Sequence, residues 1–260
     1  GKPKFFVDNA LFPQTIDVLI TRSAPIGVEL VFGEYEHTDV DDSFFGAIVQ
    51  YPDNSGSVND YRSFINKVHA VNGYVVMATD LLALTLLTAP GELGADVAIG
   101  SAQRFGVPVG FGGPHAAFFA TKEDFKRNIP GRIIGVSIDA EGNRALRMAL
   151  QTREQHIKRE KATSNICTAQ ALLANMAAMY AVYHGPERLK AIATRITVLA
   201  KTLSDGLNEL GYINSNNYYF DTLKIEVNSA SKIKSIAEAQ EVNFRDFDEK
   251  HVGIAIDETT

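Results

Sequence analysis

One stretch of the sequence is rich in glycine, so its backbone could approach a ligand closely. The stretch from Pro90 to Pro114 holds seven glycines, and His115 follows it directly. Glycine allows positive φ and lets the backbone come close to a bound molecule. Because no G-x-G-x-x-G or Walker pattern is present, a set of turns at a sheet edge explains the glycines at least as well. His115 is the side chain of this stretch that could belong to a site.

Asp80 is a candidate because it directly follows the apolar segment 74–78. An acid at the carboxyl end of a parallel strand lies where α/β sheets bind ligands. There it could pair with the ring nitrogen of a pyridine cofactor. It could equally cap a helix over Leu81–Leu87, and the residues alone favour the cap.

Lys161 is the lysine considered for covalent catalysis, and the pattern around it argues against that role. It ends the mixed-charge run 153–161, in which spacings such as Glu154 to Lys158 are typical of an exposed helix face. An exposed lysine lacks the desolvation that activates a catalytic amine. Cys167 lies beside no Cys or His motif and is interpreted as a buried structural thiol. The histidines lack metal-ligand spacing, so we expect no metal site.

Composition limits the classes of partner. The 260 residues are 45% hydrophobic, enough for a sizeable core, and carry a formal charge of −6. The negative charge disfavours a nucleic-acid or anionic-membrane surface. No apolar run reaches the roughly 20 residues that span a bilayer, and a single cysteine fits a reducing compartment. We therefore expect a soluble intracellular protein.

Hydrophobic patterning predicts two regions. In the first, buried strands alternate with helices, which is typical of a parallel sheet covered on both faces. In the second, helices are followed by a small α/β domain, which we expect to stop incomplete after Thr260 with apolar surface uncovered near Val252. Predicted strands are 5–7, 28–32, 47–51, 74–78, 222–227 and 252–256; predicted helices are 14–23 after Pro13, 60–71 ended by Gly73, 168–183, 187–210 after Gly185-Pro186, and 231–240.

Long strings along the chain are similar to one protein family. They are residues 13–15, 81–87, 101–108, 110–117, 130–137, 151–157, 159–168 and 180–186. Their residue order resembles that of the glycine cleavage system P-protein family over nearly the whole chain. This family is built of two related halves, fused or split between subunits. The sequence resembles the amino-terminal half, truncated at both ends.

The resemblance implies a fold. It is the fold-type-I, aminotransferase-like α/β architecture of enzymes that use pyridoxal phosphate (PLP), with a mainly parallel sheet and part of a small α/β domain. We expect a large domain over residues 1–165, connecting helices over 166–206 and the partial small domain over 207–260.

The resemblance also implies a site without catalysis. The cofactor lysine of the family lies in the other half, in a His-Lys-Thr string. Gln103 stands at the comparable place here, and an amide cannot form the covalent link that a lysine amine forms. Asp80 is similar in placement to the acid that pairs with the cofactor nitrogen. Asp80, Gln103 and His115 are thus expected to form a pseudo-site, with no catalytic residue and neither cofactor nor metal bound by this chain.

For the complete enzyme, the resemblance implies decarboxylation of glycine with PLP held by the other half. The aminomethyl group would pass to the lipoyl arm of the H-protein. The implied partners are the carboxy-terminal half or a catalytic subunit, the H-protein and glycine, in the bacterial cytoplasm or the mitochondrial matrix. Two alternatives remain open: an active fold-type-I PLP enzyme that uses an unexpected lysine such as Lys161, and a non-catalytic interaction module for a catalytic homologue.

Overall fold

The computed structural model describes residues 1–129, 133–150, 159–162 and 170–260. These form two compact units, one of Gly1–Ala120 with Leu172–Thr260 and one of Thr121–Ala171. Cys167 and the Glu154–Lys158 pair lie outside the described residues. Among the described helices, none combines the length and the apolar character needed to cross a membrane.

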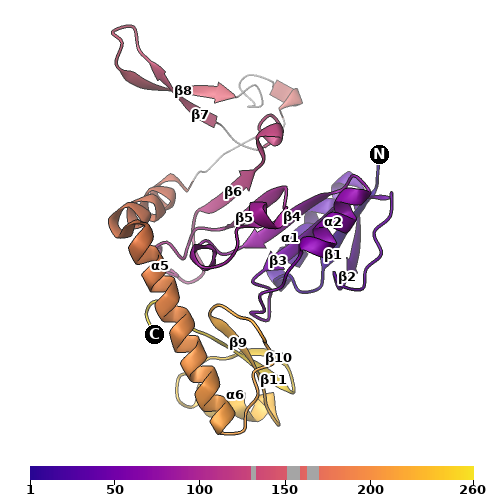
Figure 1. Cartoon of the computed structure of the whole chain (residues 1–260), viewed down its shortest axis with the longest axis vertical. Coiled ribbons are helices and arrows are strands. Elements are labelled where there is room, and N and C mark those ends of the chain that lie inside the picture. The colour runs from indigo at the N-terminus through magenta and orange to yellow at the C-terminus, as the bar shows by residue number, and fades with distance from the viewer. Residues whose placement is uncertain (130–132, 151–158, 163–169) are drawn as a thin grey trace. The chain divides into compact units, whose positions relative to one another are not determined.

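A mainly parallel sheet organises the first part of the chain (Figure 1). Neighbouring strands from β2 to β5 all pair in parallel, with Val7 opposite Ile48 and Ile48 opposite Val76. This confirms the predicted fold class and the strands expected there. In spatial order the strands are β2 (Glu29–Gly33), β1 (Lys4–Asp8), β3 (Phe44–Tyr51), β4 (Tyr74–Thr79), β5 (Val97–Ser101) and β6 (Ala117–Thr121).

Helices cover both faces of this sheet because its strands are apolar on both sides. Val75 and Met77 of β4 pack in one cluster with Phe64 of α2 (Arg62–Ala70). Val76, between them, points to the opposite face and packs with Leu19 of α1 (Pro13–Ser23). The alternation follows from the two-residue period of a strand. A short helix, α3 (Pro90–Leu93), follows β4.

The end of α2 differs in detail from the expectation. The residue with positive φ is Asn72 (φ 55°) rather than Gly73. Gly73 N–H donates to the Val68 carbonyl at 2.9 Å and Asn72 N–H donates to that of His69 at 2.9 Å, a Schellman arrangement. Gly73 is needed for packing, because a Cβ there would lie 2.8 Å from Val68 Cγ1.

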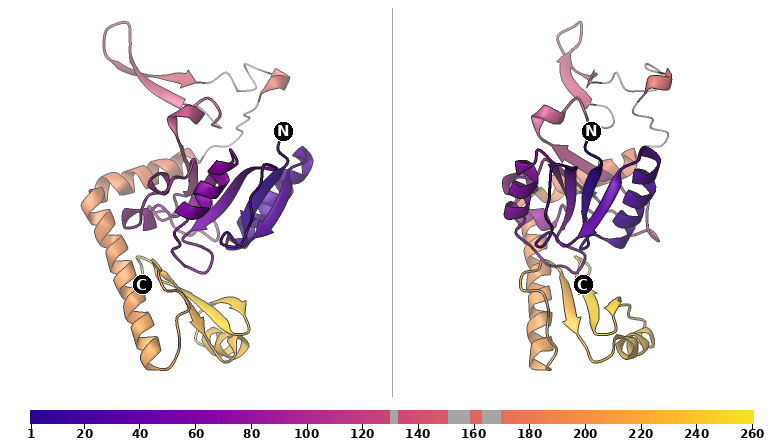
Figure 2. Two further views of the ribbon diagram at one scale, coloured as in Figure 1. Left: turned by 45° about the vertical axis from the view of Figure 1, so that its right-hand side comes forward. Right: turned by 90° about the vertical axis from the view of Figure 1, so that its right-hand side faces the viewer.

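The last part of the chain contains a long helix and a small antiparallel sheet (Figure 2). The helix α5 (Ala171–Glu209) is interrupted at Gly185, whose φ of 63° is not helical, so two helices meet there as expected. Its second half packs Ile196 and Ala200 into one core with Leu223 and Val252. The sheet runs β10 (Arg245–Asp248), β11 (His251–Ala255) and β9 (Thr222–Glu226), with α6 (Ala230–Glu238) between β9 and β10 in sequence.

Two features of this region were not expected. The strand β10 was missed. Val252, where uncovered apolar surface was expected, is only 2% exposed and is covered within the chain.

The unit Thr121–Ala171 contains an antiparallel hairpin of β7 (Ile133–Ile138) and β8 (Arg144–Leu150). A single turn of 3-10 helix follows at Arg159–Lys161. The hairpin was not predicted. The expected domain boundaries near residues 165 and 207 are not the ones that separate these two units, and they stay a prediction.

The loop after β3 fastens the parallel sheet to the small sheet. Val58 N–H donates to the Tyr218 carbonyl at 2.8 Å, and the Asn216 carboxamide donates to the Ser55 carbonyl at 2.7 Å. Between these contacts, Gly56 has φ +91°, and a Cβ there would lie 2.4 Å from the Thr222 carbonyl oxygen. Only glycine allows the two backbones to approach this closely.

We predict that Gly56→Ala destabilises the fold by at least about 3 kcal/mol, since backbone strain and overpacking add. Gly211→Ala is the matched control, because Gly211 has φ +86° and nothing within 4 Å of a built Cβ. It should cost only about 1 kcal/mol. Urea unfolding followed by far-UV circular dichroism measures both, since the chain has no tryptophan. Equal costs would show that the contact with Thr222 is unimportant.

Candidate functional site

A cavity of about 1330 Å³ opens at the carboxyl ends of β3, β4 and β5. Residues from the start of α1 and from the small sheet complete its walls. The three residues predicted from the sequence, Asp80, Gln103 and His115, all line it. Chain segments far apart in sequence therefore converge where open parallel sheets generally bind ligands.

Asp80 leaves β4 and caps the turn that follows. One carboxylate oxygen, Oδ1, accepts the backbone N–H of Leu82 at 2.7 Å and that of Ala83 at 3.4 Å. The predicted helix over 81–87 is a single 3-10 turn, Ala83–Thr85. Leu82 and Ala83 are buried in the core of the small sheet. The cap therefore helps to fix the place where the two sheets meet.

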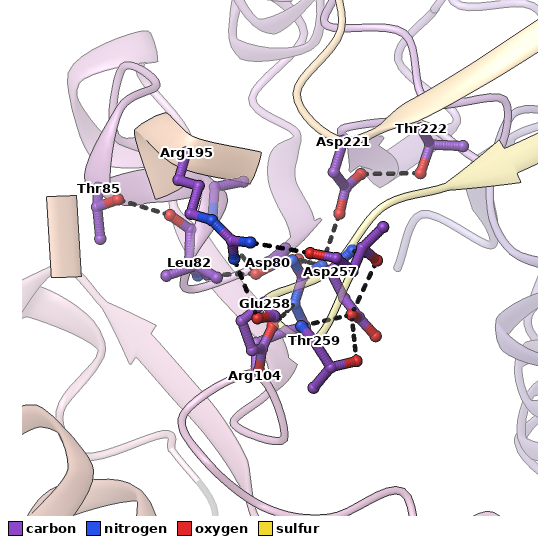
Figure 3. A network of polar contacts seen from close by, with 12 residues as sticks. Asp80, Leu82, Thr85, Arg104, Arg195, Asp221, Thr222, Asp257, Glu258 and Thr259 are labelled. Atoms are coloured by element: carbon purple, nitrogen blue, oxygen red, sulfur yellow. Dashed lines mark hydrogen bonds and ion pairs between the residues drawn. The ribbon is translucent and has the colours of Figure 1, made fainter. Parts of the chain in front are cut away.

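The other oxygen of Asp80 is held by Arg104, a residue that the sequence reasoning missed (Figure 3). Arg104 Nη1 donates to Asp80 Oδ2 at 3.0 Å and to Asp221 Oδ2 at 2.6 Å. Its Nε lies 3.8 Å from a carboxylate oxygen of Glu258, and its guanidinium stands 5.7 Å from the ring centre of Phe220. One cation therefore faces carboxylates from both sheets of the same unit.

The pKa values reflect this crowding. Burial raises the pKa of Asp80 above its usual range, although the charge of Arg104 opposes the shift. Burial disfavours the charged form of Arg104, but Asp80 and Asp221 outweigh it and raise the Arg104 pKa. The guanidinium is therefore fully charged and closely held.

Gln103 and His115 are held by Ser101 at the end of β5. Ser101 Oγ accepts the Gln103 backbone N–H at 3.1 Å and contacts His115 Nδ1 at 2.8 Å. The Gln103 carboxamide makes no hydrogen bond within the described residues and lines the cavity.

Gly106, in the glycine-rich stretch, lies against α5, since a Cβ there would be 2.4 Å from the Tyr180 ring. At Gly106, close packing within the chain explains the glycine.

These residues do not fit a covalently bound PLP. Within the described residues, no lysine lines the cavity. The carboxylate of Asp80 that could meet a pyridine nitrogen is already paired with Arg104. Lys161 is exposed and belongs to the other unit, whereas the cavity is lined by the first unit alone. The described part of the chain also has no cluster of three His, Cys, Asp or Glu side chains that could hold a metal.

The sheet order and the helix-linked small sheet define the architecture of the fold-type-I PLP enzymes. A C-DES mutant with glycine covalently linked to its PLP cofactor has this fold, with a TM-score of 0.64 at 16% identity over 98% of this chain and 70% of that one. The match concerns the fold alone.

Sequence similarity is more specific. The model of the glycine cleavage system P-protein family matches residues 1–260, so the chain belongs to this family. Glycine dehydrogenase (decarboxylating) of Nostoc punctiforme is 57% identical over 98% of this chain. The chain spans 26% of the length of that relative. A crystal structure of glycine decarboxylase (P-protein) in inhibitor-bound form gives a TM-score of 0.92 at 31% identity, over 100% of this chain and 62% of that one.

We predict that Arg104→Met destabilises the fold by about 3 kcal/mol at neutral pH, because two carboxylates lose their counter-charge. The deficit should be smaller at about pH 5 than at about pH 8. Losing Arg104 raises the Asp80 pKa further, and a carboxyl whose folded pKa exceeds its unfolded value loses stability as pH rises through the folded pKa. Urea unfolding at both pH values measures this.

Lys201→Met is the matched control for Arg104→Met. Lys201 pairs with Asp205, but both side chains are exposed, 68% and 58%. This variant should unfold like the wild type at both pH values, since exposed ion pairs contribute little. An Arg104→Met deficit that does not change with pH would contradict the assigned role of Asp80.

Proposed function

We propose that this chain is part of a glycine decarboxylase and serves as its non-catalytic half. The complete enzyme would decarboxylate glycine with PLP and pass the aminomethyl group to the lipoyl arm of the H-protein, in the bacterial cytoplasm or the mitochondrial matrix. The family membership and the names of the relatives support the activity of the whole protein. In this proposal the present chain supplies scaffold and contact surface, and the PLP is held by the other half.

One observation supports the non-catalytic role most directly. Arg104 is hydrogen-bonded to Asp80, the acid that would face a cofactor. Asp80 Oδ2 is 3.0 Å from Arg104 Nη1, and the neighbouring residue is Gln103, at the place where the resemblance puts the lysine of the family's active half. A pyridine nitrogen would have to displace a charge-assisted hydrogen bond. A carboxamide at position 103 offers only hydrogen bonds, each contributing roughly 0.5–1.5 kcal/mol net.

The first half of α5 supports a role as a contact surface. Its segment 171–184 contains no Asp, Glu, Lys or Arg. Leu172, Met179, Val182 and Tyr183 are each between 63% and 75% exposed. Uncharged apolar side chains gathered on one helix suit a protein partner. We propose that this partner is the carboxy-terminal half or catalytic subunit.

The alternative of an active enzyme that uses Lys161 receives no support from the geometry. Lys161 is exposed in a 3-10 turn. A nucleophilic lysine amine is generally buried or lies beside another cationic group.

We predict that the purified chain binds PLP no more tightly than about 1 mM, which corresponds to about −4 kcal/mol. Absorbance and calorimetric titration measure the affinity. Borohydride reduction followed by peptide mass spectrometry should find no pyridoxyl-labelled lysine. Micromolar binding with a trapped label on any lysine would overturn the non-catalytic role.

Gln103→Lys provides the gain-of-function counterpart. It should acquire a borohydride-trapped label at position 103 if Gln103 stands in the place of the cofactor lysine. Gln14→Lys is the control, since Gln14 lines the same cavity and is exposed. Equal labelling of the two variants would show that neither position is special.

A further inference from the structure

Asp8, the last residue of β1, carries a carboxyl group that is buried and only half satisfied. The residue is 2% exposed and is not among those that line the cavity. Its Oδ1 accepts the backbone N–H of Ala10 at 3.2 Å, whereas Oδ2 is buried and has no hydrogen-bond partner among the described residues. A buried carboxylate without a counter-charge is unfavourable, so this environment favours the uncharged acid.

The charged groups that act on Asp8 most strongly are acidic. Glu34 and Glu36 follow β2, and Asp53 follows β3. Burial is the main cause that raises the pKa of Asp8 to about 6, and repulsion from these three carboxylates adds to it. The hydrogen bond from Ala10 acts in the opposite direction without reversing the shift. Asp8 therefore changes charge at a higher pH than an ordinary aspartate, which does so near about pH 4.

Two tyrosines, Tyr35 and Tyr61, lie close enough for the charge of Asp8 to act on them. Their rings meet edge to face, with centres 4.6 Å apart. Burial raises the pKa of both phenols, so neither loses its proton in the range in which Asp8 titrates. The groups that act on Asp8 are thus neutral or acidic.

The turn that Asp8 holds supports the loop after β3. The Ala10 carbonyl accepts the backbone N–H of Asn54 at 2.8 Å, and the Leu11 carbonyl accepts the Asn54 carboxamide at 3.0 Å. Asn54 belongs to the loop that fastens the parallel sheet to the small sheet through Val58. The Asp8 carboxyl group is therefore linked to this joint by consecutive hydrogen bonds.

We propose that Asp8 is a pH-sensitive switch for the joint between the two sheets. At mildly acidic pH the folded chain holds Asp8 as the neutral acid, and the turn at Ala10 supports the loop. As the proton leaves, desolvation and repulsion from the neighbouring acids drive the carboxylate away from Ala10, and the loop loses this support. The competing explanation is that the ionised carboxylate stays in place, held by the Ala10 N–H.

Asp8→Asn tests the switch, because an amide has the shape of the acid and stays uncharged. A carboxyl whose folded pKa exceeds its unfolded value contributes stability at low pH and loses it as pH rises through the folded pKa. The folding constant of the wild type, relative to that of Asp8→Asn, should therefore fall about tenfold from about pH 5 to about pH 8. Urea unfolding measures both constants, and the titration of groups that the two proteins share cancels in the ratio.

Asp41→Asn is the matched control. Asp41 is exposed, and its carboxylate accepts hydrogen bonds from the backbone N–H and the hydroxyl of Ser43, which lower its pKa. It is ionised in the folded and the unfolded chain from about pH 5 to about pH 8. Its folding constant relative to the wild type should not change over this range.

Hydrogen exchange followed by NMR reads the joint itself, at the backbone N–H groups of Asn54 and Val58. After correction for the intrinsic exchange rate, their protection in the wild type should fall severalfold over the same pH range. In Asp8→Asn it should stay constant. A pH-dependent folding ratio without a change at these two amides would mean that Asp8 is not coupled to the joint, and would overturn the proposal.

A carbon-13 NMR titration of the wild-type chain needs no variant, so a folding defect in Asp8→Asn cannot mask its result. The Asp8 carboxyl should titrate with a midpoint of about 6. A midpoint near the ordinary value of about 3.9 contradicts the switch. A ratio of folding constants that is the same at both ends of the pH range contradicts it as well.

Discussion

The way in which the two sheets of the larger unit meet depends on the guanidinium of Arg104. It lies between Asp80, at the carboxyl end of the parallel sheet, and Asp221, which precedes the first strand of the small sheet. Two partly buried carboxylates this close to one cation would repel each other without it. Removing one member of a buried ion pair costs far more than the pair contributes over an apolar substitute. The interaction therefore fixes how the two sheets meet more than it adds to net stability.

The same interaction determines the chemistry left to the cavity. Asp80, which the family resemblance suggested as the partner of a cofactor ring, is paired with Arg104 within the chain. Asp80 and Asp221 both accept hydrogen bonds from Arg104.

The sequence predicted the elements whose residues are periodic or continuously apolar. The strands β1, β3 and β4 and the helices α1 and α2 were found in this way. The strand β10 was missed because Arg245-Asp246-Phe247-Asp248 is not apolar, and its pairing with β11 makes it a strand. The β7–β8 hairpin had a readable signal, since apolar residues alternate at Ile134, Val136 and Ile138 and Gly142 lies in the turn.

The candidate site was predictable only in part. Asp80, Gln103 and His115 were singled out, and the structure brings all three to one cavity. Arg104 was not found, because its role comes from a distant partner. Asp221 is 117 residues from Arg104. No local sequence pattern predicts such contacts. The one available signal was Arg104 itself, because an arginine next to Gln103 indicates that a carboxylate partner is needed.

The central claim is that Arg104, rather than a cofactor, is the partner of Asp80. A double-mutant cycle with Arg104→Met and Asp80→Asn tests it most directly, by urea unfolding with and without added PLP. The account predicts a coupling free energy of at least about 1.5 kcal/mol, unchanged by PLP. A coupling near zero, or one that PLP abolishes, would contradict it.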